Sequence, residues 1–249
     1  MTGPGTNTYL IVSGRDCVVV DPGPPEESHR RAILGAIGDL RLRGVLVTHT
    51  HPDHAPLASP LAAEFGVHTY GHGPGPGFVP SRRLQDGDRL RFGQAVLTAV
   101  HTPGHAANHL CFRMGDTVFT GDHIVGGSTV VVEDMGAYFR SLDRIRALLP
   151  ERLLPGHGNP MDDAAEVIAA YIAHRREREA QILRAVRNGA RTVGAVVQAV
   201  YGETDPRLRT AAAGSALAHL RHLAGQGRIS LEYGDQPGDA VAVRDTGVA

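Results

Sequence analysis

The segment VTHTHPDHA, residues 47–55, places three histidines and an aspartate within six positions. These residues are His49, His51, Asp53 and His54. Imidazole nitrogen and carboxylate oxygen are ligands that zinc accepts readily. An apolar run precedes the cluster and Pro52 divides it, so the spacing predicts two pairs of ligands where a buried strand leads into a helix. Two pairs suit two adjacent cations better than one.

Three further segments, HTPGHAANH, FTGDHIVGG and LLPGHGNP, each follow a predicted strand and supply His105, Asp122 and His157 respectively. Loops at strand ends are where rigid scaffolds usually present their chemistry. A carboxylate can bridge two cations that lie about 3.5–4 Å apart. We assign one cation to His49, His51 and His105 and the other to Asp53, His54 and His157, with Asp122 bridging them.

Such a pair of cations would hold a water whose pKa falls to about 7, which makes hydroxide available as a nucleophile at neutral pH. Asp53 and Asp122 are the predicted catalytic carboxylates. A structural zinc site would favour a closed, cysteine-rich tetrahedron, and the two cysteines of the chain are not grouped. The residues therefore predict an open site for two Zn²⁺, with iron or manganese as alternative metals. His109 and His123 lie near predicted ligands and could orient them.

The hydrophobic pattern predicts the elements that position these ligands. Strands are expected within 8–21 (two strands) and at 44–50, 89–93, 95–102, 109–115, 117–122 and 152–158, and helices near 26–38 and 57–66. After Pro160 the pattern becomes helical, with helices at 162–188, 192–202 and 208–227 before a strand at 228–234. This order resembles a small winged-helix module. We therefore divide the chain into a catalytic domain, 1–160, and a winged-helix-like domain, 161–249.

Composition limits the classes of partner. The 249 residues carry a net charge of −1, which gives no general attraction to nucleic acid or to anionic membranes. Residues 166–249 hold 11 arginines against 9 acidic residues, a weaker excess than DNA-reading modules usually show, so sequence-specific DNA binding is not expected. Two cysteines, no signal peptide and no long apolar run predict a cytoplasmic protein without a membrane segment.

The motifs His-x-His-x-Asp-His at 49–54, Gly-His at 104–105, Gly-Asp at 121–122 and Gly-His-Gly at 156–158 together resemble the metallo-β-lactamase superfamily. The resemblance covers the first 160 residues. It implies an α/β (α+β) fold, an αββα sandwich that holds the metals at one edge of its two sheets.

The segments GTNTYLI, TPGHAANH and VVVEDMGAYFRSLDRI look like the lactamase-like endoribonucleases that carry a C-terminal winged helix. This resemblance implies cleavage of single-stranded RNA, with a glyoxalase II-like hydrolysis of a small ester or thioester as the alternative. A β-lactamase or a ligand-sensing regulator is a weaker alternative. Asn7, Thr129 and Tyr138 are the candidate substrate contacts.

Two features depart from that family pattern. Ala106 stands where a threonine is usual. Relatives also have a strand before GTNTY, so a late start at Met1 would remove a sheet edge.

Overall fold

A computed structural model describes residues 5–127, 129–202, 209–232 and 242–246. Two five-stranded sheets form its centre. The first contains, in spatial order, β1 (Tyr9–Ser13), β2 (Asp16–Val20), β3 (Arg41–Leu46), β4 (Thr69–Gly71) and β5 (Arg82–Arg83). The second contains β10 (Arg152–Pro155), β9 (Thr117–Gly121), β8 (Leu110–Met114), β7 (Ala95–His101) and β6 (Arg89–Phe92).

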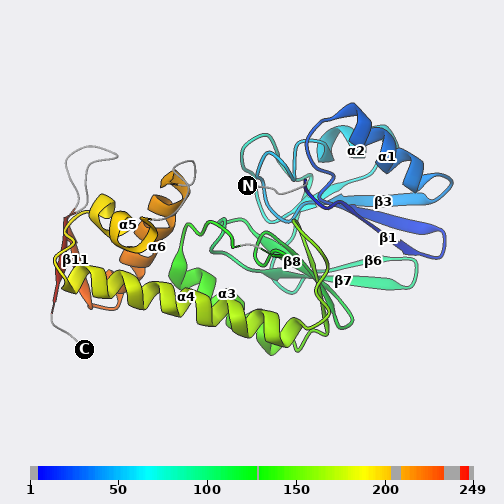
Figure 1. The fold of residues 1–249 in the computed structure, drawn as a ribbon. Helices are drawn as coiled ribbons and strands as arrows, with labels where there is room; N and C mark the ends of the chain where they lie inside the picture. The colour runs from blue at the N-terminus through cyan, green and yellow to red at the C-terminus, as the bar shows by residue number, and fades with distance from the viewer. Residues whose placement is uncertain (1–4, 128, 203–208, 233–241, 247–249) are drawn as a thin grey trace.

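Helices cover the outer face of each sheet (Figure 1). α1 (Glu27–Ile37) and α2 (Ala58–Phe65) lie on the first sheet, and α3 (Met135–Ala147) and α4 (Ala164–Arg187) lie on the second. Strand β2 shows how the layers form. Cys17 and Val19 pack toward α1 and α2, whereas Val18 and Val20 pack between the sheets, because successive side chains of a strand point to opposite faces. The predicted αββα sandwich is confirmed.

Strand direction brings the candidate ligands to one edge. β2, β3 and β4 run parallel to one another, and β9 runs parallel to β10. β7 has the same direction as β9 because both are antiparallel to β8. The carboxyl ends of these strands therefore share one edge of each sheet, and the segments that follow them converge there.

The structure corrects the predicted position of the first ligand segment. β3 ends at Leu46, so His49 and His51 lie in a loop beyond the strand, and α2 begins only at Ala58. The backbone N–H of Thr48 donates to a carboxylate oxygen of Asp21 at 2.7 Å, in place of a strand partner. The ligand segment is thus a loop held by a side chain.

The C-terminal part contains α5 (Val193–Tyr201), α6 (Arg209–Gly225) and the antiparallel pair β11 (Ile229–Glu232) and β12 (Ala242–Asp245). The sequence pattern did not predict β12. α4 spans both parts of the molecule (Figure 1). Ala164, Ile168 and Ile172 join the core of the second sheet, whereas Ile182, Leu183 and Val186 join the core formed with α5 and α6.

The change from one core to the other therefore falls inside α4, and the predicted boundary at residue 160 lies just before this shared helix. Among the described residues, no helix combines the length and the apolar character that crossing a bilayer requires.

Candidate metal centre

All seven predicted ligand residues come together at the shared sheet edge in two groups. The first is His49, His51, His105 and Asp122, and the second is Asp53, His54 and His157. Within each group, one potential ligand atom per residue lies within 4.8 Å of the others. The groups match the division that the sequence predicted for two cations.

Three imidazole nitrogens converge in the first group. His51 Nδ1 lies 2.9 Å from His49 Nε2 and 3.0 Å from His105 Nε2, and the latter two atoms are 3.3 Å apart. Tetrahedral bonds of about 2.0–2.1 Å to zinc would separate ligand nitrogens by about 3.3 Å. The nitrogens therefore lie near the spacing that a single cation requires.

Asp122 faces both groups, with one carboxylate oxygen toward each. Its Oδ1 lies 3.4 Å from His54 Nε2 and 3.3 Å from His157 Nε2. Its Oδ2 lies 3.7 Å from His105 Nε2 and 4.0 Å from His49 Nε2. Asp53 completes the second group, with Oδ2 at 3.1 Å from His157 Nε2. This is the arrangement expected of a carboxylate that bridges two ions.

Two observations test whether the cluster fits metal ions. His54 Nε2 and Asp122 Oδ1 are buried and make no hydrogen bond, a costly state unless a cation pairs with them. Gly156 keeps the space beside them open, since a Cβ at that position would lie 2.6 Å from Asp122 Oδ1 and 2.7 Å from His54 Cε1. The donor set and the open space both fit a dinuclear site.

The second ring nitrogen of most of these histidines is held by a defined partner. Nδ1 of His49 lies 3.0 Å from Thr48 Oγ1, that of His54 2.9 Å from Asp21 Oδ2, that of His105 2.7 Å from the Val131 carbonyl and that of His157 2.9 Å from the Gly5 carbonyl. Such contacts fix the tautomer and the ring orientation. Each of these four rings therefore directs its Nε2 into the cluster.

Sequence reasoning missed Asp21. This residue follows β2 and is only 2% exposed. Its Oδ1 accepts from Thr48 N at 2.7 Å, and its Oδ2 accepts from Thr48 Oγ1 at 2.7 Å and from His54 Nδ1. Its φ of 50° is unusual for a residue other than glycine. The available signal was an Asp-Pro-Gly sequence at the end of a strand that leads to the ligand edge.

Burial and the neighbouring carboxylates shift the pKa values of these histidines in opposite directions. Burial holds the pKa of His49 well below its ordinary value and lowers that of His105 to about 4. Burial also disfavours the charged form of His54, but Asp21 and Asp122 outweigh it and raise its pKa to about 10. His157 is raised to about 10 as well, because Asp122 and Asp53 outweigh its burial.

The pKa values of the two carboxylates, Asp122 and Asp53, are lowered. Burial opposes ionisation of Asp122, yet the nearby rings of His157 and His54, whose Nε2 atoms lie 3.3 Å and 3.4 Å from Oδ1, hold its pKa well below the ordinary range. Burial also opposes ionisation of Asp53, but its hydrogen bond with His157 and other contacts outweigh burial and lower its pKa to about 2. Metal uptake would therefore displace protons from His54 and His157, while both carboxylates are already ionised.

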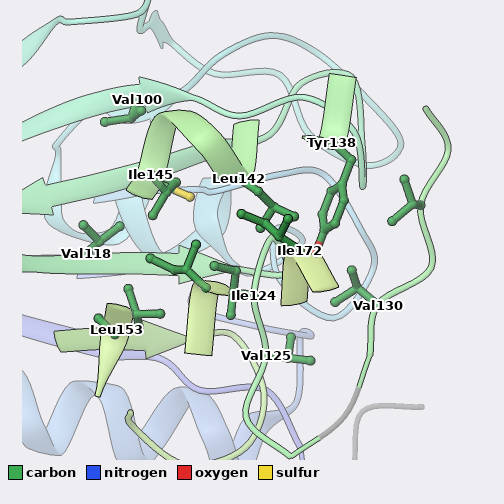
Figure 2. Packing of buried hydrophobic residues seen from close by; sticks show 14 of the residues in the cluster. Val100, Val118, Ile124, Val125, Val130, Tyr138, Leu142, Ile145, Leu153 and Ile172 are labelled. Atoms are coloured by element: carbon green, nitrogen blue, oxygen red, sulfur yellow. The ribbon is translucent and has the colours of Figure 1, made fainter. Parts of the chain in front are cut away.

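The predicted substrate contacts occupy different environments. Tyr138 is fully buried, its hydroxyl donates to the His123 carbonyl at 2.6 Å, and it lies in the hydrophobic cluster drawn in Figure 2. Its predicted role as a substrate contact is therefore wrong, because the ring packs in the core. Thr129 is exposed, and its role stays a prediction.

Asn7 holds the loop that carries His157. Its Nδ2 donates to the carbonyls of Pro155 at 2.9 Å and Gly158 at 2.8 Å, and its backbone N–H donates to Gly156 O at 2.7 Å. The side-chain donor of Asn7 is thus committed to backbone contacts, which indicate a structural role beside the site.

His109 and His123 are also buried. The ring of His109 lies 5.1 Å from that of His49, and its Nδ1 lies 2.9 Å from Thr102 Oγ1. His109 thus packs against a ligand, and the nearest aromatic neighbour of His123 is Tyr138, at 4.7 Å between ring centroids.

An αββα sandwich with a His/Asp cluster at the edge of both sheets defines a class of metal-dependent hydrolases. The chain belongs to the metallo-beta-lactamase superfamily, whose family profile matches residues 1–157. A second profile, described as the beta-lactamase associated winged helix domain, matches residues 192–235. Both results confirm the predicted family and its C-terminal module.

Relatives match over most of the chain. The beta-lactamase-like protein 2 homolog of Drosophila melanogaster is 34% identical over 251 residues, which cover 93% of this chain and 86% of the fly protein. An atrochrysone carboxyl ACP thioesterase of Aspergillus chevalieri is 33% identical over 244 residues, covering 92% of this chain and 78% of that protein.

Two solved structures are similar to this chain in fold. A beta-lactamase domain protein from Burkholderia ambifaria shares the fold with a TM-score of 0.83 at 24% identity, covering 97% of this chain and 87% of that one. A protein crystallised in a di-iron-bound form aligns with a TM-score of 0.53 at 31% identity, covering 65% of this chain and 91% of that one.

Proposed function

We propose that this chain hydrolyses thioester or ester bonds at a dinuclear zinc centre. The proposed ligands are His49, His51 and His105 for one ion, Asp53, His54 and His157 for the other, and Asp122 for both. The position of Asp122, with one oxygen toward each group, carries the proposal of a dinuclear hydrolase. The thioester class is supported by the Aspergillus thioesterase, which is similar over 92% of this chain.

When bound, two such ions would polarise a substrate carbonyl and lower the pKa of a water molecule between them. The side chain of Asp53 is 30% exposed and that of Asp122 only 12%, so Asp53 is the carboxylate more open to an arriving substrate. Its lowered pKa keeps Asp53 ionised at neutral pH, and an ionised Oδ2 can orient a water by accepting its hydrogen bond. Thr6 Oγ1 donates to that same oxygen at 3.0 Å and limits its rotation.

Cleavage of single-stranded RNA is the second candidate. The winged-helix module and the small excess of arginine after residue 165 favour it. Several of those arginines are engaged within the protein, however. Arg184 pairs with Glu177 at 2.9 Å, and the guanidinium of Arg178 lies 4.4 Å from the centroid of the Tyr201 ring. The remaining positive charge supports only weak contact with phosphates.

The packing of α6 also argues against reading of duplex DNA. Ala218 lies in the core cluster that contains α3, and His222 packs its ring 5.4 Å from that of Phe139 on α3. Winged-helix and related proteins read DNA by placing an exposed helix in the major groove. The face of α6 that touches α3 is covered by the catalytic domain, so it is not available for that role.

A parallel assay separates the candidates. The full-length protein, loaded with zinc, is offered an acyl thioester, an end-labelled single-stranded RNA and a β-lactam. Asp122→Asn should abolish the true activity, and His68→Ala is the matched control because His68 is exposed and its Nδ1 lies 3.2 Å from Ser81 Oγ. The proposal is supported if the wild type and His68→Ala hydrolyse the thioester and Asp122→Asn does not. If RNA cleavage is instead lost in Asp122→Asn and kept in His68→Ala, while the thioester is not hydrolysed, the endoribonuclease function replaces the thioesterase function.

Zinc is the proposed metal because catalytic zinc sites use histidine and carboxylate ligands such as these. Iron and manganese stay as alternatives, and the di-iron-bound relative supports iron. Metal analysis of the protein purified without chelators decides among them. We also propose a cytoplasmic location, which is supported by Cys17 and Cys111, both free thiols in the structure.

A further inference from the structure

The segment 122–131, which the structure describes except for residue 128, is connected to two of the proposed ligands. It begins at Asp122, which faces both ligand groups, and ends at Val131, whose carbonyl accepts a hydrogen bond from His105 Nδ1 at 2.7 Å. His105 keeps its orientation only while that carbonyl stays in place. What holds the backbone of this segment therefore matters to the geometry of the metal centre.

Two residues of α4 hold that backbone. The Tyr171 hydroxyl donates to Val125 O at 2.7 Å and accepts from Val125 N at 3.0 Å. Arg175 Nη2 donates to Val130 O at 2.6 Å. Residues four apart on a helix lie on the same face, so one face of α4 forms hydrogen bonds to the segment at two positions. Val125 and Val130 belong to the same hydrophobic cluster as Ile172 of α4 (Figure 2).

The burial of Arg175 is the unusual feature. The residue is 3% exposed, and among the described residues no carboxylate lies within ion-pair distance of its guanidinium. That group instead lies 5.4 Å from the centroid of the Tyr138 ring and bonds to the Val130 carbonyl. Burying a charge without a paired charge is costly, and apolar residues of similar volume often stabilise a core better. Packing alone does not account for an arginine at this position.

The far half of α4 is fixed by the C-terminal module. Ile182, Leu183 and Val186 share a core with α5 and α6. One turn beyond Arg175, Glu179 accepts a hydrogen bond from His222 Nδ1 of α6 at 2.6 Å. The C-terminal module therefore holds α4 in position, and the other half of α4 forms the hydrogen bonds to the segment 122–131.

We propose that Arg175 and Tyr171 are positioning residues of the metal centre, and that the C-terminal module supports the site through α4. Their contacts fix Val125 and Val130, so that the neighbouring Val131 carbonyl orients His105 and Asp122 keeps its place between the two groups. The proposal rests on the proposed dinuclear centre and is independent of the substrate.

The chain offers a matched control for the arginine. Arg178 also lies on α4, donates to a carbonyl (Val200 O, 3.1 Å) and stacks on a tyrosine ring, that of Tyr201. Both of its partners belong to the C-terminal module. Arg175→Met and Arg178→Met therefore remove the same kinds of contact from the same helix, but only the first touches the segment that leads to the site.

The first measurement is amide hydrogen exchange of the metal-free, full-length protein. Val125 N–H donates to Tyr171, and Gly126 N–H donates to the His157 carbonyl. We expect these amides to exchange about tenfold faster or more in Arg175→Met, since loss of one buried hydrogen bond typically changes an opening equilibrium by that order. Exchange in this segment should be unchanged in Arg178→Met.

The second measurement is zinc affinity by competition with a chelator. Loss of a partner that orients a ligand typically costs about 10- to 100-fold in metal affinity, and Arg175 acts one contact further away, so we expect about tenfold. The ion at His49, His51 and His105 should weaken more than the other, because His105 depends directly on the Val131 carbonyl. Arg175→Lys can still donate to Val130 O, so it should lose less zinc affinity than Arg175→Met. Tyr171→Phe should also lose less zinc affinity than Arg175→Met.

The outcomes are distinct. Normal zinc binding with unchanged exchange in Arg175→Met, or equal effects in Arg178→Met, would overturn the positioning role. An equal loss of both ions together with a lower melting temperature would reduce Arg175 to a stabilising residue and also overturn it. Wild-type protein that binds no zinc would instead overturn the proposed metal centre. Should Arg175→Met fail to fold, Arg175→Lys and Tyr171→Phe carry the same test.

Discussion

Replacing Asp21 by asparagine should weaken metal binding about 10- to 100-fold, although Asp21 is not a proposed ligand. The change preserves size, and asparagine tolerates the positive φ of 50° at this position. Asp21 Oδ1 can still accept from Thr48 N. The altered atom is Oδ2, which accepts from Thr48 Oγ1 and from His54 Nδ1. The Thr48 hydroxyl can rotate to accept instead.

His54 has no such freedom. An amide NH₂ facing its Nδ1 favours the tautomer in which Nδ1 accepts and Nε2 carries the proton. The nitrogen that faces the ligand group is then blocked, so the ion at Asp53, His54 and His157 should be the one lost. One charge-assisted hydrogen bond also disappears, which should lower the free energy of unfolding by about 1.5–3 kcal/mol.

The assay is zinc competition together with urea unfolding, carried out on the wild type, Asp21→Asn and Asp16→Asn. Asp16 lies on the same strand, β2, and pairs with Arg41 at 2.9 Å, away from the metal edge. Its substitution should leave zinc affinity unchanged. If Asp21→Asn binds both ions like the wild type, the argument that Asp21 sets the tautomer of His54 is refuted.

Three further predictions follow from the site and from its support. Asp122→Ala should abolish turnover, because it removes the carboxylate proposed to contact both ions, whereas His123→Ala should cost at most about 10- to 100-fold; equal losses in a steady-state assay would reject the bridging assignment. Elemental analysis should find about two transition metal ions per chain, and a reproducible value near one would contradict the dinuclear site. Burial opposes ionisation of Glu179, but His219 and His222 outweigh it and lower its pKa from the ordinary 4.5. Its stabilising contribution should therefore be complete above pH 4.5 and be lost as the pH falls through the lowered value. Glu179→Gln should be less stable than the wild type at pH 7, and denaturation curves of the two should converge in acid; a constant difference would exclude this linkage.

The sequence by itself was enough to identify the candidate ligands. Histidine and aspartate at 49–54, followed by His105, Asp122 and His157 after later strands, could be identified because ligand chemistry restricts residue type and because strand ends are visible in the hydrophobic pattern. Most elements were predictable for the same reason, since local periodicity reflects which face is buried. The structure brings the seven side chains together in two groups, and this grouping could be predicted from their types and their order.

Tertiary structure alone decided how those ligands are held. Asp21 bonds to His54 across 33 positions, Asn7 reaches Pro155 across 148, and Arg175 reaches Val130 across 45. No local pattern reports such pairs, because they depend on which strand ends meet and on how helices pack over them. The same limit misplaced Tyr138: an aromatic residue near a motif looks the same in sequence whether its ring lines a pocket or, as here, fills the core under α3. Residue type and spacing along the chain identify the candidate metal ligands, and packing between distant segments decides what orients them.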